Sequence, residues 1–145
     1  MGKCFKHITE NINDFISEQK IFFVGTGPNA EDEVNISPQG HDTLKIINGN
    51  KIIYLDYFDS ENETAKHLAE NGKITLMWCG FDSKPSILRA YGHGKVIAKG
   101  TDEFSRLLRQ YFNGYDENMV RQLFEVQIHK VMTTCGFGVP IFDFL

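Results

Sequence analysis

The sequence has no long apolar run and no excess of basic residues. No stretch reaches the roughly 18 apolar residues that a membrane-spanning helix needs, and residues 1–10 lack the apolar centre of a signal peptide. Fifteen Lys and Arg stand against 19 Asp and Glu, a formal charge of −4 at pH 7. Such a chain offers no basic field to a nucleic acid or an anionic membrane. We therefore expect a cytoplasmic protein with neither kind of partner.

Cysteine is scarce and poorly placed for structural roles. Cys4, Cys79 and Cys135 are an odd number, widely separated, and no histidine stands near them at a zinc-ligand spacing. A disulfide framework and a structural zinc site are therefore not expected. The 5 histidines are scattered singly, which is more typical of surface or turn residues than of metal ligands. No metal site is predicted.

The residues that are present suit one globular domain. Of the 145 residues, 41% are hydrophobic and 12% aromatic, and no repeat or flexible linker divides residues 1–145. Hydrophobic periodicity predicts helices and strands along most of the chain. The predicted helices cover residues 8–19, 62–71 and a segment that begins near 101, and the predicted strands cover 20–26, 33–37, 43–47, 51–56, 73–79, 86–99 and 121–133. Thr9 or Asn11 can cap the start of the first helix, and Asn71-Gly72 predicts a left-handed end of the second.

The order of these elements predicts a mainly β fold with peripheral helices. Short turns join most strands, without the regular helices that a parallel sheet requires, so an antiparallel barrel or curled sheet is expected. Asn48-Gly49-Asn50 predicts a tight hairpin. Gly92 and Gly94 predict a bulge or a close backbone approach. Residues 52–55 and 74–78 are apolar on both faces, so a helix or a second subunit must cover them.

Common enzyme motifs are absent or incomplete. Gly25-Thr26-Gly27 follows an apolar strand, but the third glycine of a dinucleotide fingerprint is missing. The chain also has no Gly-x-Ser-x-Gly motif, so local sequence builds no nucleophile elbow. Neither a dinucleotide site nor a serine hydrolase is expected.

Two segments admit both a structural and a ligand-binding interpretation. Residues 35–40 end a strand in a proline and a glycine, which suits a plain turn or leaves backbone groups free for a planar heterocycle. At residues 59–64, Ser60 and Glu63 fit a capping box that starts a helix. The alternative there is an anion site on the free N–H groups, which Glu61 and Glu63 oppose because they repel a phosphate.

Seven short segments in order resemble the pyridoxamine 5'-phosphate oxidase-related flavoproteins. Each segment is weakly specific alone, but together they run nearly end to end. The segments are Phe22 to Thr26, Val34 to Gly40, Tyr54 to Asp56, Ser60 to Thr64, Trp78, Pro85 with Leu88 to Gly92, and Cys135 to Pro140. The resemblance implies an antiparallel split β-barrel that forms a homodimer, with one FMN in each of two clefts between the subunits.

The resemblance also implies which residues bind the cofactor. The family's flavin strand faces the ring and ribityl chain, and here it matches Asn35, Ile36, Ser37 and Pro38. The next strand faces the polar edge of the flavin through Leu55 and Asp56, and the helix start holds the phosphate through Ser60, Asn62 and Thr64. The residues that could reach the cofactor from the partner subunit are Arg89, Tyr91, Gly136 and Phe137.

Two departures from the family shape the expected function. Glu61 and Glu63 replace basic residues of the phosphate segment, so N–H donors, Lys66 or Arg89 must neutralise the phosphate. The C-terminal arginine and histidine motif for pyridoxamine phosphate is not visible, so that substrate is not expected. The resemblance then implies an FMN-dependent oxidoreductase that acts on an unidentified small organic substrate. The alternatives are a non-catalytic carrier of flavin, deazaflavin or haem, and a structural dimer with a degenerate cleft.

Overall fold

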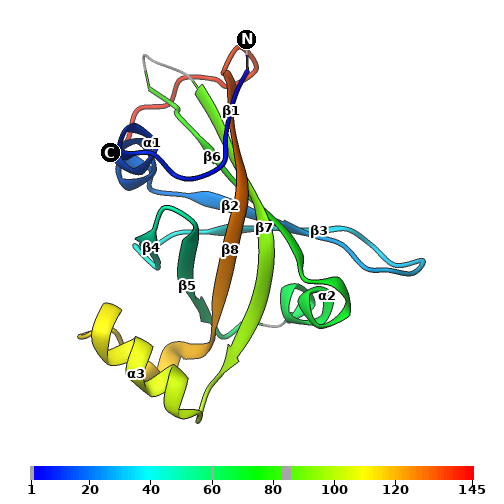
Figure 1. Cartoon of the computed structure of the whole chain (residues 1–145). Coiled ribbons are helices and arrows are strands. Elements are labelled where there is room, and N and C mark those ends of the chain that lie inside the picture. Colours follow the sequence, from blue (N-terminus) through cyan, green and yellow to red (C-terminus); the bar gives the residue numbers. More distant parts are fainter. Residues whose placement is uncertain (1, 60, 83–85) are drawn as a thin grey trace.

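The computed structural model describes residues 2–59, 61–82 and 86–145 (Figure 1). Within them, strands outnumber helices, as the sequence predicts. The strands are β1 (Lys3–Phe5), β2 (Phe22–Thr26), β3 (Asn35–Gln39), β4 (Leu44–Asn48), β5 (Lys51–Tyr57), β6 (Lys73–Cys79), β7 (Ser86–Ala98) and β8 (Val120–Cys135), and the helices are α1 (Glu10–Glu18), α2 (Glu63–Asn71) and α3 (Asp102–Tyr111), with a 3-10 turn at Glu117–Met119. Ser60 and Pro85, both used in the family resemblance, lie outside the described residues.

All eight strands belong to one antiparallel sheet, which confirms the predicted mainly β, antiparallel class. Its order is β3-β2-β6-β7-β8-β5-β4, and β1 adds to β8. The long strands β7 and β8 run through the middle of the sheet, while β3 and β4 end the path on opposite sides (Figure 1). Asn48 pairs with Lys51, so Gly49 and Asn50 form the predicted tight hairpin.

Glycines let β7 bend where α2 packs on it. The register between β7 and β8 shifts between Tyr91 and Gly92, and a Cβ at Gly92 would overlap the carbonyl oxygen of Gln127. A Cβ at Gly94 would lie 2.9 Å from Leu68 of α2. The predicted bulge and close approach are both confirmed, because the register shifts at Gly92 and a Cβ there would overlap backbone, whereas a Cβ at Gly94 would require the Leu68 side chain to shift.

Two cores meet at β5. Its residues Ile52 and Tyr54 face a large core beneath α1, whereas Ile53 and Leu55 face a second core closed by α3 (Figure 1). The sequence left open whether a helix or a second subunit covers residues 52–55, and α3 covers them. On β6 only one face is sealed in this way, because Met77 on the other face is only half buried.

The helix starts show one success and one error of the sequence analysis. Thr9 caps α1 as expected, since its hydroxyl accepts a hydrogen bond from the N–H of Ile12 at 3.3 Å. The capping box at α2 is wrong: the helix begins at Glu63, so this residue comes too early to occupy the third helical position. Gly72 ends α2 in the left-handed conformation, with φ of 71°, as predicted.

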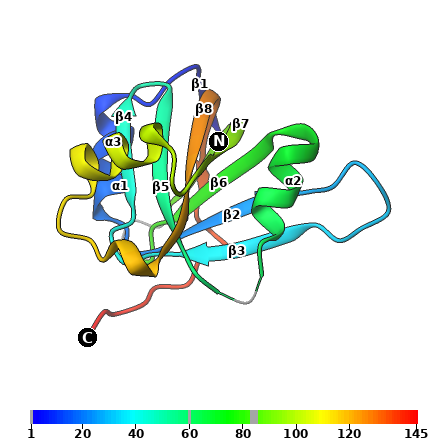
Figure 2. The ribbon, with the colours of Figure 1, turned by 90° about the horizontal axis from the view of Figure 1, so that it is seen from below.

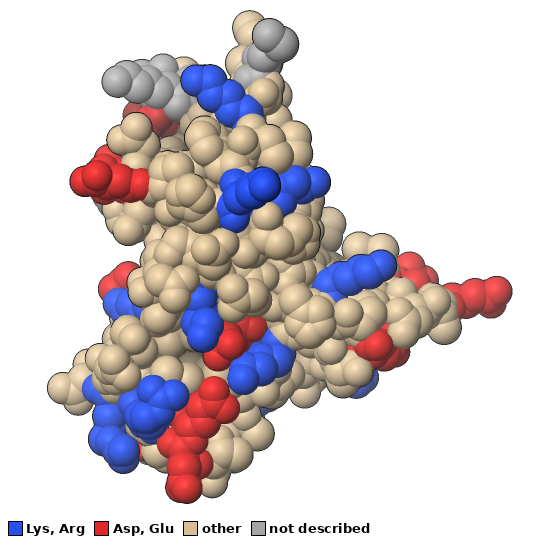
Figure 3. Space-filling view, viewed as in Figure 1, with Lys and Arg blue, Asp and Glu red and all other residues tan. Residues whose placement is uncertain are grey.

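Charged side chains are mixed over the face seen in Figure 3, without one continuous basic patch. The projecting β2–β3 hairpin carries acidic side chains at its tip, where Glu31, Asp32 and Glu33 follow one another (Figure 3). Among the described helices, none is long and apolar enough to cross a membrane.

Candidate functional site

A cavity of about 330 Å³ lies where β3, the end of β5, the start of α2 and β8 meet. Figure 2 shows β3 next to the start of α2. Polar groups dominate the lining. The lining residues are Asn35, Ile36, Ser37, Pro38 and Gln39 of β3, Asp56 and Asp59 at the end of β5, Glu61, Asn62, Glu63 and Thr64 at the start of α2, and Arg121 of β8.

Half of the residues predicted to bind a cofactor come together at this cavity. They are Asn35, Ile36, Ser37, Pro38, Asp56, Asn62 and Thr64. They converge because β3 is the edge strand of the sheet and α2 begins beside it. Their role in cofactor binding stays a prediction.

The structure does not bring the other predicted residues to the cavity. Leu55 is fully buried against α3, and its N–H donates to the carbonyl of Thr43. Lys66 points away to pair with Glu63. Ser60 lies outside the described residues. On the tail after β8, Gly136 is buried and Phe137 is 96% exposed.

Arg89 and Tyr91 lie on the opposite side of the protomer's sheet from the large core. Arg89 shares one cross-strand row with Met77, Phe23 and Pro38, which crosses from β7 to β3. Three strand spacings separate Arg89 from β3, a distance of roughly 14 Å. Arg89 therefore does not line this protomer's own cavity, and its action across a dimer stays a prediction.

The free edge of β3 forms one wall of the cavity. β3 pairs with β2 alone among the described strands, and Pro38, which has no N–H to donate, is tolerated at such an edge. Asn35 donates from Nδ2 to the hydroxyl oxygen of Ser37 at 2.9 Å. Ile36 is 70% exposed, which is unusual for a large apolar side chain of a strand. This wall offers backbone groups, small polar side chains and one apolar surface.

The floor of the cavity contains a buried charge network that the sequence analysis missed. Asp56 is only 5% exposed. Its Oδ2 accepts hydrogen bonds from Arg121 Nε at 2.9 Å and from Gln122 Nε2 at 2.7 Å. Gln122 also donates to Asn62 Oδ1 at 2.8 Å, which joins β8 to the start of α2. No local pattern pairs residues so far apart in the chain, although Arg121-Gln122 does open the last predicted strand.

Asp59 is a second carboxylate beside Arg121. Its Oδ1 lies 3.3 Å from the guanidinium NH2 of Arg121 and accepts the N–H of Glu61 at 2.8 Å. Burial lowers the pKa of Arg121, but the hydrogen bond and charge of Asp56, followed by those of Asp59, outweigh burial and raise that pKa overall. Arg121 is therefore held in its charged form by two carboxylates of the chain itself.

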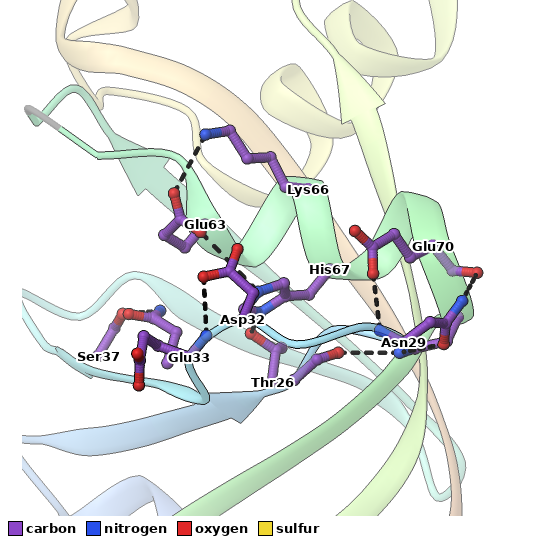
Figure 4. Close-up of polar contacts among 12 residues, drawn as sticks. Thr26, Asn29, Asp32, Glu33, Ser37, Glu63, Lys66, His67 and Glu70 are labelled. Carbon is purple, nitrogen blue, oxygen red and sulfur yellow. Dashed lines mark hydrogen bonds and ion pairs between the residues drawn. The ribbon is translucent and has the colours of Figure 1, made fainter.

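His67 lies buried behind the cavity wall, which corrects the expectation that every histidine is a surface or turn residue. Its Nδ1 is 2.9 Å from the hydroxyl of Thr26, and its Nε2 is 3.8 Å from Glu63 Oε2 (Figure 4). Glu63 also pairs with Lys66 at 3.1 Å. One carboxylate thus faces the cavity on one side and a buried imidazole on the other.

The family model described as Pyridoxamine 5'-phosphate oxidase matches residues 8–135 of this chain. The chain belongs to this family. The resemblance drawn from seven short segments is thereby confirmed. A curated relative, the pyridoxamine 5'-phosphate oxidase family protein ustO of Aspergillus flavus, is 32% identical over an alignment of 148 positions, which covers 96% of this chain. The alignment covers 56% of ustO, so the chain spans only about half the length of that relative.

Solved structures share the fold at low sequence identity. HupZ from Group A Streptococcus matches with a TM-score of 0.67 and 18% identity over 86% of this chain and 91% of that one. An FMN-binding protein from Syntrophomonas wolfei matches with a TM-score of 0.58 and 21% identity, over 78% of this chain and 76% of that one. HutZ, a haem storage protein from Vibrio cholerae, matches with a TM-score of 0.62 and 16% identity, over 90% of this chain and 96% of that one. These likenesses establish the fold, and they include proteins with different cofactors.

The cavity fits the two ends of an FMN molecule unequally. The β3 edge, Asn62 and Thr64 offer neutral hydrogen-bonding groups that suit an isoalloxazine ring and a ribityl chain. A phosphate dianion, in contrast, would meet four lining carboxylates and one lining cation, which is already paired. The residues present fit the neutral part of a flavin and do not fit its phosphate.

Proposed function

We propose that this protein is a homodimeric flavin-binding oxidoreductase that acts on a small organic substrate. The observation that carries the proposal is the polar cavity of about 330 Å³ on the free edge of β3. This volume falls in the range of small-molecule sites, where a few placed polar groups orient a ring. Family membership supports the cofactor class, because the family commonly contains FMN-binding proteins.

The chain's residues would position the ring rather than react with it. A bound flavin supplies the redox chemistry itself, so the protein needs no catalytic triad. Backbone groups at the edge of β3 would bond the polar rim of the ring, and the exposed Ile36 side chain would cover one of its faces. The network of Asp56, Arg121 and Gln122 would hold the floor rigid below it.

A second copy of the chain is the partner that fits the open face of the sheet. Phe23, Met77 and Met132 lie in one cross-strand row on that face and are each half buried. Arg89 stands in the same row, so a dimer that pairs these faces would direct it toward the partner's cofactor. The dimer, the organic substrate and the cytoplasmic location all stay proposals.

The absorption spectrum of the purified protein, recorded together with sedimentation velocity, tests the proposed function. We expect a dimer that acquires flavin absorption bands when supplied with flavins. Ser37→Trp, which fills the cavity, should abolish flavin binding, whereas Asn113→Trp in the exposed turn after α3 should retain it. A haem Soret band without flavin bands, or a monomer that binds no flavin, would overturn the proposal.

A further inference from the structure

We infer that the cavity selects riboflavin, the flavin without a phosphate, over FMN, because carboxylates outnumber cations among the described residues that line it and two of them already pair with its arginine. The inference rests on the proposed flavin-binding function and concerns the part of the same cavity that Asp59 and Arg121 line.

The guanidinium of Arg121 already pairs with two carboxylates of the chain. It is the only cationic side chain among the described residues that line the cavity. Its Nε bonds Asp56 Oδ2 at 2.9 Å, and its NH2 group pairs with Asp59 Oδ1 at 3.3 Å. A phosphate that approached this arginine would therefore meet two carboxylates beside it. Asp56 is held in place, because it is buried and would lose the positive charge that balances its own if it moved away.

A backbone donor near the cavity is also occupied. The N–H of Glu61 donates to Asp59 Oδ1 at 2.8 Å. Asp59 therefore bonds both a guanidinium and a backbone N–H, the two kinds of donor that a phosphate site combines. An internal carboxylate thus competes with a phosphate oxygen for these two donors.

Two more carboxylates add to the repulsion. Glu61 and Glu63 line the cavity beside Asp59. Lys66 pairs with Glu63 at 3.1 Å (Figure 4), but it is not among the residues that line the cavity. Even with Lys66 included, carboxylates outnumber cations by two (four against two) at this end of the site.

Riboflavin ends in an uncharged hydroxyl, so these carboxylates do not repel it as they repel a phosphate. A phosphate monoester carries a charge of about −1.5 to −2 at pH 7, so each nearby carboxylate repels it. A ribityl chain that ends in a hydroxyl can instead donate a hydrogen bond to a carboxylate such as Glu61. The side chain of Asp59 is 63% exposed, so solvent screens part of its repulsion of a phosphate. The buried and half-buried carboxylates therefore contribute more to that repulsion.

The test is a pair of titrations of the protein, stripped of ligand, with riboflavin and with FMN, each followed by flavin fluorescence. We expect a Kd for riboflavin about tenfold or more below that for FMN, a ratio of the size that one close charge pair produces. In Asp59→Asn, which frees Arg121 and removes a carboxylate, the ratio of the two Kd values should fall. Glu18→Gln, an equal charge change on exposed α1 outside the cavity, should keep the wild-type ratio.

The outcomes separate the inference from the proposed function. If FMN binds as tightly as riboflavin, with or without added Mg²⁺ to bridge phosphate and carboxylates, the inference is overturned and flavin binding stands. A ratio that does not change in Asp59→Asn also overturns it. If neither flavin binds, the proposed function itself fails, and the inference fails with it.

Discussion

The hydroxyl of Thr26 and Nδ1 of His67 lie 2.9 Å apart, and both side chains are buried. This hydrogen bond joins the end of β2 to the middle of α2. It therefore holds the helix whose first residues line the cavity. The other ring nitrogen of His67, Nε2, finds no hydrogen-bond partner among the described residues. Thr26 thus makes the hydrogen bond on which this buried imidazole depends.

Replacing Thr26 with valine should destabilise the protein, because a buried ring nitrogen of His67 loses its partner. We expect the free energy of unfolding to fall by about 1–3 kcal/mol, the usual cost of leaving a buried polar group unsatisfied. Urea denaturation followed by circular dichroism measures the change. Thr26→Ser keeps the hydroxyl and serves as the matched control. A Thr26→Val variant within about 0.5 kcal/mol of wild type would show that His67 needs no such partner.

The hydroxyl of Tyr54 should lower the free energy of unfolding. It is buried and makes no hydrogen bond to any described residue, while the centroid of the ring lies 5.5 Å from that of Phe22 and 5.1 Å from that of Phe124. Tyr54→Phe keeps the ring contacts and should raise the free energy of unfolding by about 1 kcal/mol. Tyr115→Phe, which removes a 2.6 Å hydrogen bond to the Asp42 carbonyl, should lower it. Equal effects of the two substitutions would contradict this account.

The same hydroxyl should make the protein sensitive to alkali. Burial, and then the charge of Asp56, raise the pKa of Tyr54 well above its ordinary value. The folded state therefore keeps a proton that the unfolded state releases above about pH 10. Stability should decline as pH rises beyond that point and stay unaffected by Tyr54 below it. Tyr54→Phe should flatten the decline without abolishing it, because burial also raises the pKa of Tyr57.

Alanine at Gly92 should disturb the pairing of the two longest strands. The added Cβ would overlap the backbone carbonyl of Gln127, which cannot rotate away as a side chain can. We expect a loss of about 1–3 kcal/mol in the free energy of unfolding, as in overpacked cores. Gly138→Ala is the control, since a Cβ there meets nothing within 4 Å. If both variants have the wild-type free energy of unfolding, the backbones of β7 and β8 do not approach closely at Gly92.

The three cysteines should differ in reactivity. Cys4 and Cys135 are exposed, whereas Cys79 is buried. Burial raises the pKa of the Cys79 thiol, and the charge of Arg89 opposes that rise only in part. Iodoacetamide should therefore alkylate Cys4 and Cys135 in the native protein and Cys79 only in denaturant, as peptide mass spectrometry would detect. Rapid labelling of native Cys79 would contradict its burial.

Local patterns predicted most elements because each follows from neighbouring residues. Residues 73–79 form a short apolar run that ends before a glycine, and the predicted strand coincides with β6. Asn71-Gly72 correctly marked the end of α2. The strand β1 was missed, because three residues carry no period and pair only once β8 is in place. The start of α2 was predicted to within one residue, but its capping box was wrong, because Glu63 is the first helical residue and pairs with Lys66 and His67.

The sequence by itself determined the mainly β class, most element positions, the family and seven of the cavity residues, because alternation, turn residues and segment order are properties of neighbouring positions. Only the tertiary structure decided that α3 rather than a second subunit covers β5, and that Arg121 and Gln122 hold Asp56. The physical reason is register: β5 and β8 pair so that Gln122 lies opposite Asp56, 66 residues away. Such distant pairs form through folding and leave no local pattern.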